Sequence, residues 1–357
     1  MSATAPPSGN ASSAGDDPTG DAPSAGSGGT PGNGRVPGTV QETDTVPRLD
    51  DLPEPVTAGP GDPAVHHVRV LLDKRLRSLL RHEPGTRNGA DIEDLHQMRV
   101  AVRRMRAALK SARPLLDAAW ADGLRSELGW LGRALGPSRD LDVMIDRLRG
   151  ETATLPPAER SAGDLLVGRL DVERVTARRA MNADLDDPRY GAVVRRLVDA
   201  VAEPLPEPPE GVARPELVDL VRAEARKLDK AVRRAGDDPP DMTLHDLRIR
   251  TKRLRYTGEL VEPAMRTDKG KRTPAAKTVR KVLKAAAELQ EVLGDHQDAC
   301  VAEHRIRQLL DDLGGAPDAH VVFVGGRLVE RERARAEHLR GQWRDAWEEL
   351  GARTSSL

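Results

Sequence analysis

Two stretches of this chain, residues 95–109 and 244–258, repeat each other and carry the spacing of an amphipathic helix. They read LHQMRVAVRRMRAAL and LHDLRIRTKRLRYTG. In both, apolar residues recur every three or four positions, so they lie on one helical face that needs a partner to cover it. A chain with two such copies has two equivalent apolar stripes, and each needs other helices to cover it.

Three further pairs of segments match in the same order along the chain. They are 68–82 with 221–235, 135–142 with 293–300, and 168–170 with 326–328. Four matches in one order indicate an internal duplication. We predict a first half at 64–202 and a second half at 215–350, joined by the proline-rich linker 203–214.

The composition favours helices over strands. Aromatic residues make up 2% of the chain, whereas the good helix formers Ala, Leu, Arg and Glu are abundant. We expect an all-α fold with helices near 64–82, 91–116, 119–135, 138–149, 157–183, 188–202, 215–235, 242–262, 275–293, 296–312 and 317–350. Gly136–Pro137 and Gly294–Asp295 are each expected to end one helix before the next begins.

Residues 1–62 differ from the rest of the chain. They are rich in Gly, Pro and Ser, lack hydrophobic periodicity, and hold nine acidic but two basic residues. Such a segment buries too little apolar surface to offset chain entropy, so we expect a disordered acidic tail. Subtracting it from totals of 56 basic and 57 acidic residues leaves 54 and 48 for the remainder. The helical domain, 63–351, is therefore basic although the chain has a formal net charge of −1.

The first repeated helix carries a row of basic residues beside its apolar stripe. The row recurs at i, i+3, i+7, i+10 and i+14 and consists of His96, Arg99, Arg103, Arg106 and Lys110. It lies about 100° around the helix from the stripe, so it borders the buried face. Its counterparts in the second repeat are His245, Arg248, Lys252 and Arg255. Outside the rows, the matched basic pairs are Arg104 with Arg253, Lys74 with Lys227, Arg77 with Lys230, and Arg81 with Arg234.

An ordinary solvated helix face would intersperse acids with these bases, but residues 95–116 contain six bases and no acid. Like charges at i, i+4 destabilise a helix by roughly a few tenths of a kcal/mol each, which a bound anion offsets. Arginine forks and mobile lysines suit phosphate oxygens. The row spans about 21 Å, more than a mononucleotide needs, which indicates a linear polyanion. His96 and His245 either add pH-dependent charge or tie helices together.

The histidine-led helices, with LGPSRDLDV downstream, resemble the CHAD family (conserved histidine α-helical domain) over about 64–350. The resemblance implies two antiparallel helical bundles related by a pseudo-twofold axis around a basic central channel. It also implies inorganic polyphosphate as the ligand, held by His96, Arg99, Arg103, Arg104, Arg106 and their counterparts in the second half, and it links some members to polyphosphate or polyhydroxyalkanoate granules. The other basic residues named above are expected to extend this binding surface. Arg139 matches the family's R-D pair and joins the expected ligands, whereas Asp140 is expected to pair with a base or cap a helix. Gln297 replaces that arginine in the second half, which predicts weaker binding there.

No constellation for catalysis stands out in the sequence. The chain lacks a P-loop motif, G-x-S-x-G and H-E-x-x-H, and it lacks the E-x-E-x-K string of the triphosphate tunnel domain attached to many CHAD relatives. We therefore expect binding without catalysis, cofactor or metal. The single Cys300, the lack of a long apolar run and the lack of a signal-peptide pattern predict a cytoplasmic protein that does not enter membranes.

Two alternatives stay open. Nucleic acid is the closer rival, because basic helical grooves also suit DNA or RNA. Against it, the rows hold no aromatic platform before Tyr256, and the basic excess of the domain is small. The other alternative is a scaffold on a granule surface, which an exposed amphipathic face on the Trp343–Trp347 helix would support.

Overall fold

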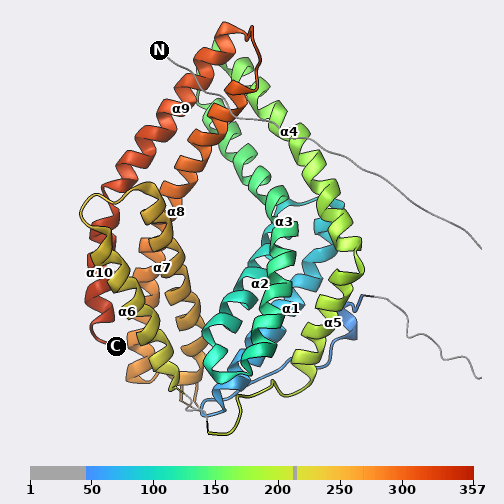
Figure 1. The fold of residues 1–357 in the computed structure, drawn as a ribbon, viewed down its shortest axis with the longest axis vertical. Coiled ribbons are helices and arrows are strands. Elements are labelled where there is room, and N and C mark those ends of the chain that lie inside the picture. Colours follow the sequence, from blue (N-terminus) through green and yellow to red (C-terminus); the bar gives the residue numbers. More distant parts are fainter. Residues whose placement is uncertain (1–45, 212–214, 268) are drawn as a thin grey trace, which may run out of the picture. The chain divides into compact units, whose positions relative to one another are not determined.

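The computed structural model describes residues 46–211, 215–267 and 269–357, which belong to one compact unit (Figure 1). Its α-helices are α1 (Ala64–Asn88), α2 (Ile92–Ser111), α3 (Ala118–Ala153), α4 (Pro157–Asp186), α5 (Pro188–Ala202), α6 (Leu217–Ala235), α7 (Asp241–Val261), α8 (Pro274–Asp311), α9 (Ala319–Arg340) and α10 (Trp343–Thr354). Short 3-10 helices are η1 (Leu49–Asp51), η2 (Arg113–Leu115) and η3 (Pro263–Met265). The β pairing within the described residues is one isolated bridge, Arg266 with Arg272. The predicted all-α fold is confirmed.

Capping side chains and a glycine explain several helix boundaries. Asp91 accepts a hydrogen bond from the backbone N–H of Glu93 at 2.8 Å where α2 begins. Asp117 accepts one from the backbone N–H of Trp120 at 2.7 Å where α3 begins. Helix α1 ends at Gly89, whose φ of 66° lies in the left-handed region that glycine adopts without strain. These residues satisfy backbone groups that a helix end leaves without partners.

Three predicted helix boundaries are wrong. Helix α3 runs through Gly136–Pro137, and α8 runs through Gly294–Asp295, so each is one long helix where two short ones were expected. Conversely, the single helix predicted over 317–350 is two helices, α9 and α10, separated at Gly341 and Gln342. Contacts between distant helices, described below for Gly136 and Gly294, outweigh the local signals at the first two positions.

Each half contains its own hydrophobic core. The first core is formed mainly by α1, α2, α3 and α5, with Leu220 and Leu260 of the second half at its border, and the second by α6, α7, α8 and α10. Val46, Leu49, Leu52 and Val56 also pack against the first core. The segment 46–62 therefore belongs to the folded unit, although the predicted acidic tail extends through it; residues 1–45 lie outside the described residues. Trp343 is 2% exposed in the second core, so it does not offer the exposed apolar face that a granule scaffold needs.

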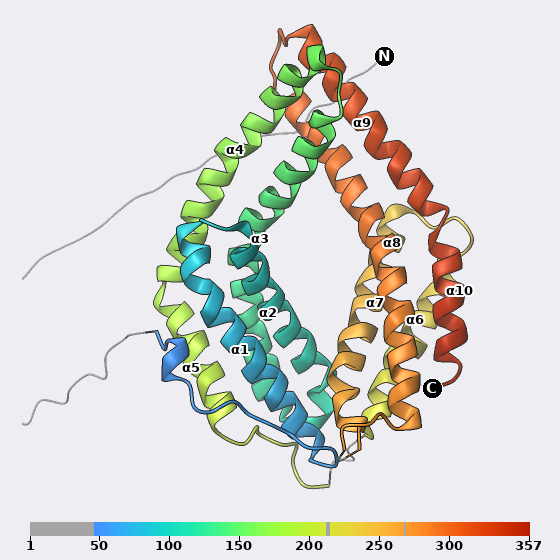
Figure 2. The same cartoon turned by 180° about the vertical axis from the view of Figure 1, so that it is seen from behind.

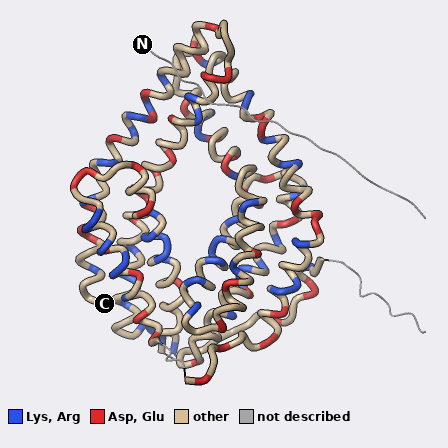
Figure 3. Tube along the Cα trace, in the orientation of Figure 1, with Lys and Arg blue, Asp and Glu red and all other residues tan. Residues whose placement is uncertain are grey.

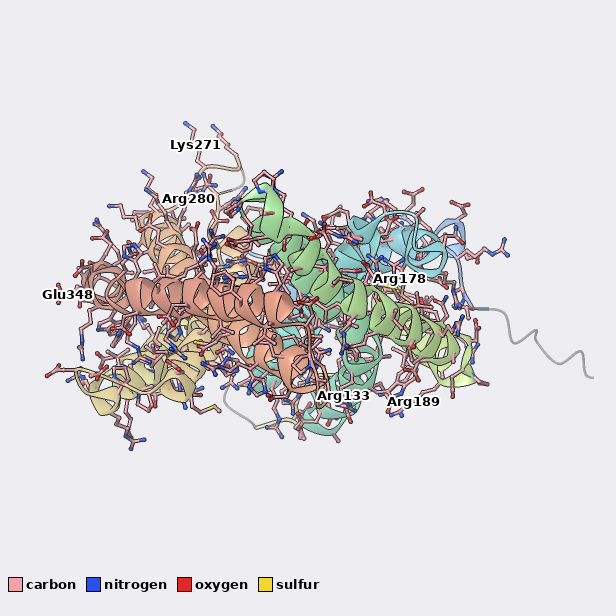
Figure 4. The ribbon with its side chains drawn as sticks, turned by 90° about the horizontal axis from the view of Figure 1, so that it is seen from above. Arg133, Arg178, Arg189, Lys271, Arg280 and Glu348 are labelled. Atoms are coloured by element: carbon pink, nitrogen blue, oxygen red, sulfur yellow. The ribbon has the colours of Figure 1, made fainter. Side chains whose placement is uncertain are left out.

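A third core joins the two halves at the end far from α6 and α10. It combines Leu148, Leu166 and Leu170 of the first half with Ile306 and Leu328 of the second, among others. Seen from above, α4 and α9 meet there (Figure 4). This shared core stabilises the position of one half against the other through burial of apolar surface.

The halves also touch where α2 meets α7 (Figure 2). The hydroxyl groups of Ser111 and Thr257 are 2.6 Å apart at this contact. The halves are thus held at two places, and the ribbons diverge between them. Residues 203–211 of the predicted linker form no helix, and 212–214 lie outside the described residues. Within the described chain, no helix combines the length and apolar character that crossing a bilayer requires.

Candidate polyanion-binding surface

Helix α2 carries its basic row along the edge of a buried face, as the sequence predicts. Its apolar stripe, from Leu95 to Leu109, is buried in the first core. Figure 3 shows Lys and Arg gathered where α2 and α3 face α7. Within the row, His96 and Arg99 are half-buried, and Arg103, Arg106 and Lys110 are exposed.

Arg99 reaches from α2 onto α3 at a glycine. Its Nη2 donates to Asp140 Oδ1 at 3.0 Å, and its Nη1 donates to the carbonyl of Gly132 at 3.4 Å. A Cβ atom on Gly136 would lie 2.7 Å from this Nη1, so a larger residue there would displace the guanidinium. Gly136 therefore makes room for Arg99 inside α3 and does not end the helix. The expected pairing of Asp140 with a basic residue is confirmed.

Arg248 makes the corresponding contact in the second half. Its Nη2 lies 3.6 Å from Asp298 Oδ1, and a Cβ on Gly294 would lie 3.5 Å from its Nε. These three residues occupy the positions that align with Arg99, Asp140 and Gly136. The shared contact explains why the two LG segments match in sequence, while the duplication itself stays a prediction.

Lys252 of α7 lies half-buried among arginines from both halves. Burial, followed by the charges of Arg248 and then Arg103, lowers its pKa from 10.5 to about 8, although Asp298 partly opposes the shift. Across the described ranges, neither Lys252 nor Arg103 has an acidic side chain within ion-pair distance. The two helices therefore bring positive charges together across the contact between the halves, and Asp298 offsets them only in part.

Lys110, in the last turn of α2, is surrounded by further cations. Burial and then Arg253 of α7 and Arg125 of α3 lower the pKa of Lys110, and Lys227 of α6 acts in the same direction. Glu224 raises it, but the carboxylate of Glu224 is already 2.6 Å from Lys227 Nζ. Cations from three other helices thus gather around Lys110.

An acid occupies another part of the contact between α2 and α7. Glu259 Oε2 lies 3.2 Å from Arg104 Nη1, and its Oε1 accepts a hydrogen bond from Arg255 Nε at 3.0 Å. The guanidinium carbons of Arg104 and Arg255 are 5.9 and 5.6 Å from the centroid of the Tyr256 ring. These two predicted ligands are therefore already paired with a carboxylate.

The two histidines have different surroundings. Burial and then Arg139 lower the pKa of His96, although Glu93 opposes the shift. His96 is therefore neutral at pH 7 unless an anion binds nearby. In the second half, His245 Nδ1 is 2.8 Å from Gln297 Oε1, a contact that ties α7 to α8. Gln297, which replaces the arginine of the R-D pair in the second half, is thus the partner of His245.

The basic residues predicted on α1 do not all reach the surface of α2. Arg77 forms an ion pair with Asp73 at 3.0 Å and donates to the carbonyl of Pro53, so it fixes the segment before α1. Lys74 is exposed and lines a cavity of about 280 Å³, together with Arg75. Lys74 therefore lies close to α7, through this cavity.

The basic residues predicted on α6 lie together. Lys227, Lys230 and Arg234 line a cavity of about 360 Å³ between α6 and α7, which Arg250 also borders. Lys227 connects this group to Lys110. Arg81, the counterpart of Arg234, is exposed on α1.

Three arginines near the surface are absent from the sequence prediction. Arg125 and Arg133 of α3 approach Arg106. Burial and the charges of these two arginines lower the pKa of Arg106. Arg75 of α1 approaches Arg104 in the same way. Asp122 and Glu127 lie close to Arg125 in the sequence, so charge pattern alone carries no signal there. Arg75 aligns with Leu228 in the second half, so the repeat does not mark it either. Knowing which face of α3 covers α2 would have identified Arg125 and Arg133.

One cluster of residue types that bind metals lies away from this surface. The ligand atoms of Asp241, His296 and Cys300 lie within 4.8 Å of one another. Asp241 also forms an ion pair with Arg340, and burial raises the pKa of the Cys300 thiol to about 11. A cation would therefore compete with a guanidinium and a protonated thiol, so we interpret the cluster as a polar link between α7, α8 and α9.

Comparison with known proteins agrees with this architecture. Residues 70–307 match the family model of the CHAD domain. Two uncharacterised proteins of Mycobacterium tuberculosis, from strains CDC 1551 / Oshkosh and H37Rv, are 31% identical over 304 residues, which cover 82% of this chain and 54% of each relative. The chain thus spans about half the length of these relatives.

Two solved structures share the fold. PptA from Streptomyces chartreusis has a TM-score of 0.62 at 22% identity, and the match covers 82% of this chain and 100% of that one. The CHAD domain from the plant Ricinus communis has a TM-score of 0.62 at 26% identity, covering 85% and 96%. With the family match spanning most of the helical unit, the chain belongs to the CHAD domain family.

Proposed function

We propose that this CHAD domain binds inorganic polyphosphate, without catalysing a reaction on it, on the cations that α2, α3, α6 and α7 bring together. One observation carries the proposal: Lys252 lies near Arg103, and Lys110 near Arg253, and the acids Asp298 and Glu224 offset these positive charges only in part. Crowded like charges raise the free energy of the empty protein. A bound polyanion recovers this free energy, which favours binding.

The extent of the surface supports a polymer as the ligand. The α2 row from His96 to Lys110 spans about 21 Å at the helical rise per residue. A chain with a negative charge on every unit can contact several of these cations at once and release the counterions bound to it. The guanidinium groups offer paired donors to phosphate oxygens, and the lysines adapt to their positions.

Titration with polyphosphate of defined length at two salt concentrations tests the proposal. We expect the logarithm of the binding constant to fall by about 0.7 per contacted phosphate for each logarithmic unit of salt. The variant Arg103→Ala with Lys252→Ala should bind more weakly and with a smaller salt slope. The control variant, Arg233→Ala with Arg333→Ala, loses the same charge from exposed arginines that pair with acids. Equal losses in both variants would mean that the basic residues between the halves are not the site.

Competition with labelled DNA tests the rival ligand. Tyr256 is 6% exposed and lies near two guanidinium groups, so its ring offers little surface for base stacking. We therefore expect polyphosphate to displace DNA at a much lower concentration of phosphate groups. Displacement at equal or higher concentration would favour nucleic acid as the ligand.

The same surface would hold the protein on polyphosphate granules in a cell. Granules sedimented from cell extracts should retain the wild-type chain and the control variant but release the Arg103→Ala, Lys252→Ala variant. Equal retention of all three would indicate attachment through another part of the protein.

A further inference from the structure

Helices α2 and α7 carry opposite charges at one pair of equivalent positions. Extending the repeat alignment by one residue pairs Lys110 with Glu259, and the same alignment pairs Arg104 with Arg253. Lys110 lies near Arg253, whereas Glu259 lies 3.2 Å from Arg104. The same contact between the halves thus occurs twice: an arginine of one half faces a lysine in one case and a carboxylate in the other.

The surroundings of Lys110 and Glu259 increase the difference in charge between the two contacts. Lys110 is surrounded by the cations of α3, α6 and α7 described above, which act to lower its pKa. The carboxylate of Glu259 contacts Arg104 and Arg255, and its charge also raises the pKa of Arg75, against the larger effect of burial. Two guanidinium groups from different helices around one anionic group is also the arrangement in which arginines bind a phosphate.

We propose that the anion path along the contact between α2 and α7 is open at Lys110 and closed at Glu259, whose carboxylate takes the place of one phosphate. The inference rests on the proposed binding of polyphosphate. A bound polymer covers Lys110, Arg253 and Lys227 and stops where Glu259 repels it. The cavity lined by Glu259 and Lys74 stays free of polymer.

Lysine acetylation followed by mass spectrometry tests this on the unmodified protein. Saturating polyphosphate should slow acetylation of Lys110 and Lys227 and leave Lys74, which is exposed beside Glu259, at its original rate. Protection of Lys74 as strong as that of Lys110 would overturn the inference. A flat binding isotherm would instead refute the proposed function itself.

The substitution Glu259→Gln tests the role of the carboxylate directly. Glutamine keeps a hydrogen-bond acceptor for Arg104 and removes the charge, so one more phosphate can bind. We expect tighter binding, a salt slope steeper by about 0.7, and protection of Lys74. The control Glu127→Gln removes the same charge from an ion pair with Arg189 elsewhere on the molecule. Identical salt slopes for the two variants would contradict the proposal.

If circular dichroism shows that Glu259→Gln unfolds, a second pair of variants tests the same difference between the two ends. Lys110→Glu places a carboxylate at the open end, so it should weaken binding and shorten the polymer that saturates the site. Lys74→Glu makes the same change at the closed end and should have little effect. Equal weakening by both substitutions would show that the two ends do not differ.

Discussion

Raising the pH from 7 to 9 should weaken polyphosphate binding, because Lys252 loses its proton over that range. Its pKa in the empty protein is about 8, set by burial and by the arginines beside it. A polyanion bound next to the ammonium group restores the pKa toward the ordinary 10.5 of lysine. The complex therefore holds a proton that the free protein releases as the pH rises through 8, so the affinity is highest below that value.

The magnitude follows from the fraction of neutral lysine in the free protein. With a pKa of about 8, about a tenth of Lys252 is neutral at pH 7 and about nine-tenths at pH 9. Because Lys252 must be protonated on binding, the affinity for polyphosphate should fall about tenfold between pH 7 and pH 9, which corresponds to about 1.4 kcal/mol. Lys110, whose pKa is also lowered, adds to the effect in the same direction.

Fluorescence anisotropy with long labelled polyphosphate at constant ionic strength would measure this dependence. Calorimetry at pH 8 in buffers of different ionisation enthalpy should detect uptake of about half a proton per site. Lys252→Arg keeps the charge and does not titrate in this range, so it should bind normally at pH 7 and lose most of the pH dependence. A wild-type affinity that is equal at pH 7 and 9, or an arginine variant that weakens as much as wild type, would refute the reasoning.

Four further substitutions separate stability from binding. Arg103→Ala should leave thermal stability unchanged or raise it by a few tenths of a kcal/mol, because it removes repulsion; a fall of several degrees in Tm would contradict this. Gly136→Ala should displace Arg99 and weaken polyphosphate binding. Its stability should change little, because the gain in helix propensity of about 1 kcal/mol offsets the crowding against Arg99. Gly294→Ala, where a Cβ meets only an ordinary contact, should raise stability in urea denaturation and keep the affinity. Leu170→Ala, in the core shared by the halves, should cost about 2–5 kcal/mol in urea; a cost near zero would mean that this core does not hold the halves together.

Periodicity in the sequence was sufficient to predict the fold class and most of the helices. The stripe from Leu95 to Leu109 is buried as predicted, because a repeat of about 3.6 residues places one face of α2 against its neighbours. The basic row beside it follows from the same geometry. Local signals were misleading at Gly136 and Gly294, which both lie inside long helices. Gly136 leaves room for Arg99 of another helix, whereas a side chain at Gly294 would meet Arg248 at an ordinary contact distance.

The sequence alone predicted which basic residues exist on these faces, but not which of them are free to bind an anion. Arg77 pairs with Asp73 and Arg104 with Glu259, whereas Arg103 stays without an acid in the described chain. Arg104 and Glu259 belong to different halves, and their distance depends on how the two cores pack. Charges act over a few ångströms in space whatever their separation along the chain, so only the tertiary structure decides whether a cation is paired or open to a ligand.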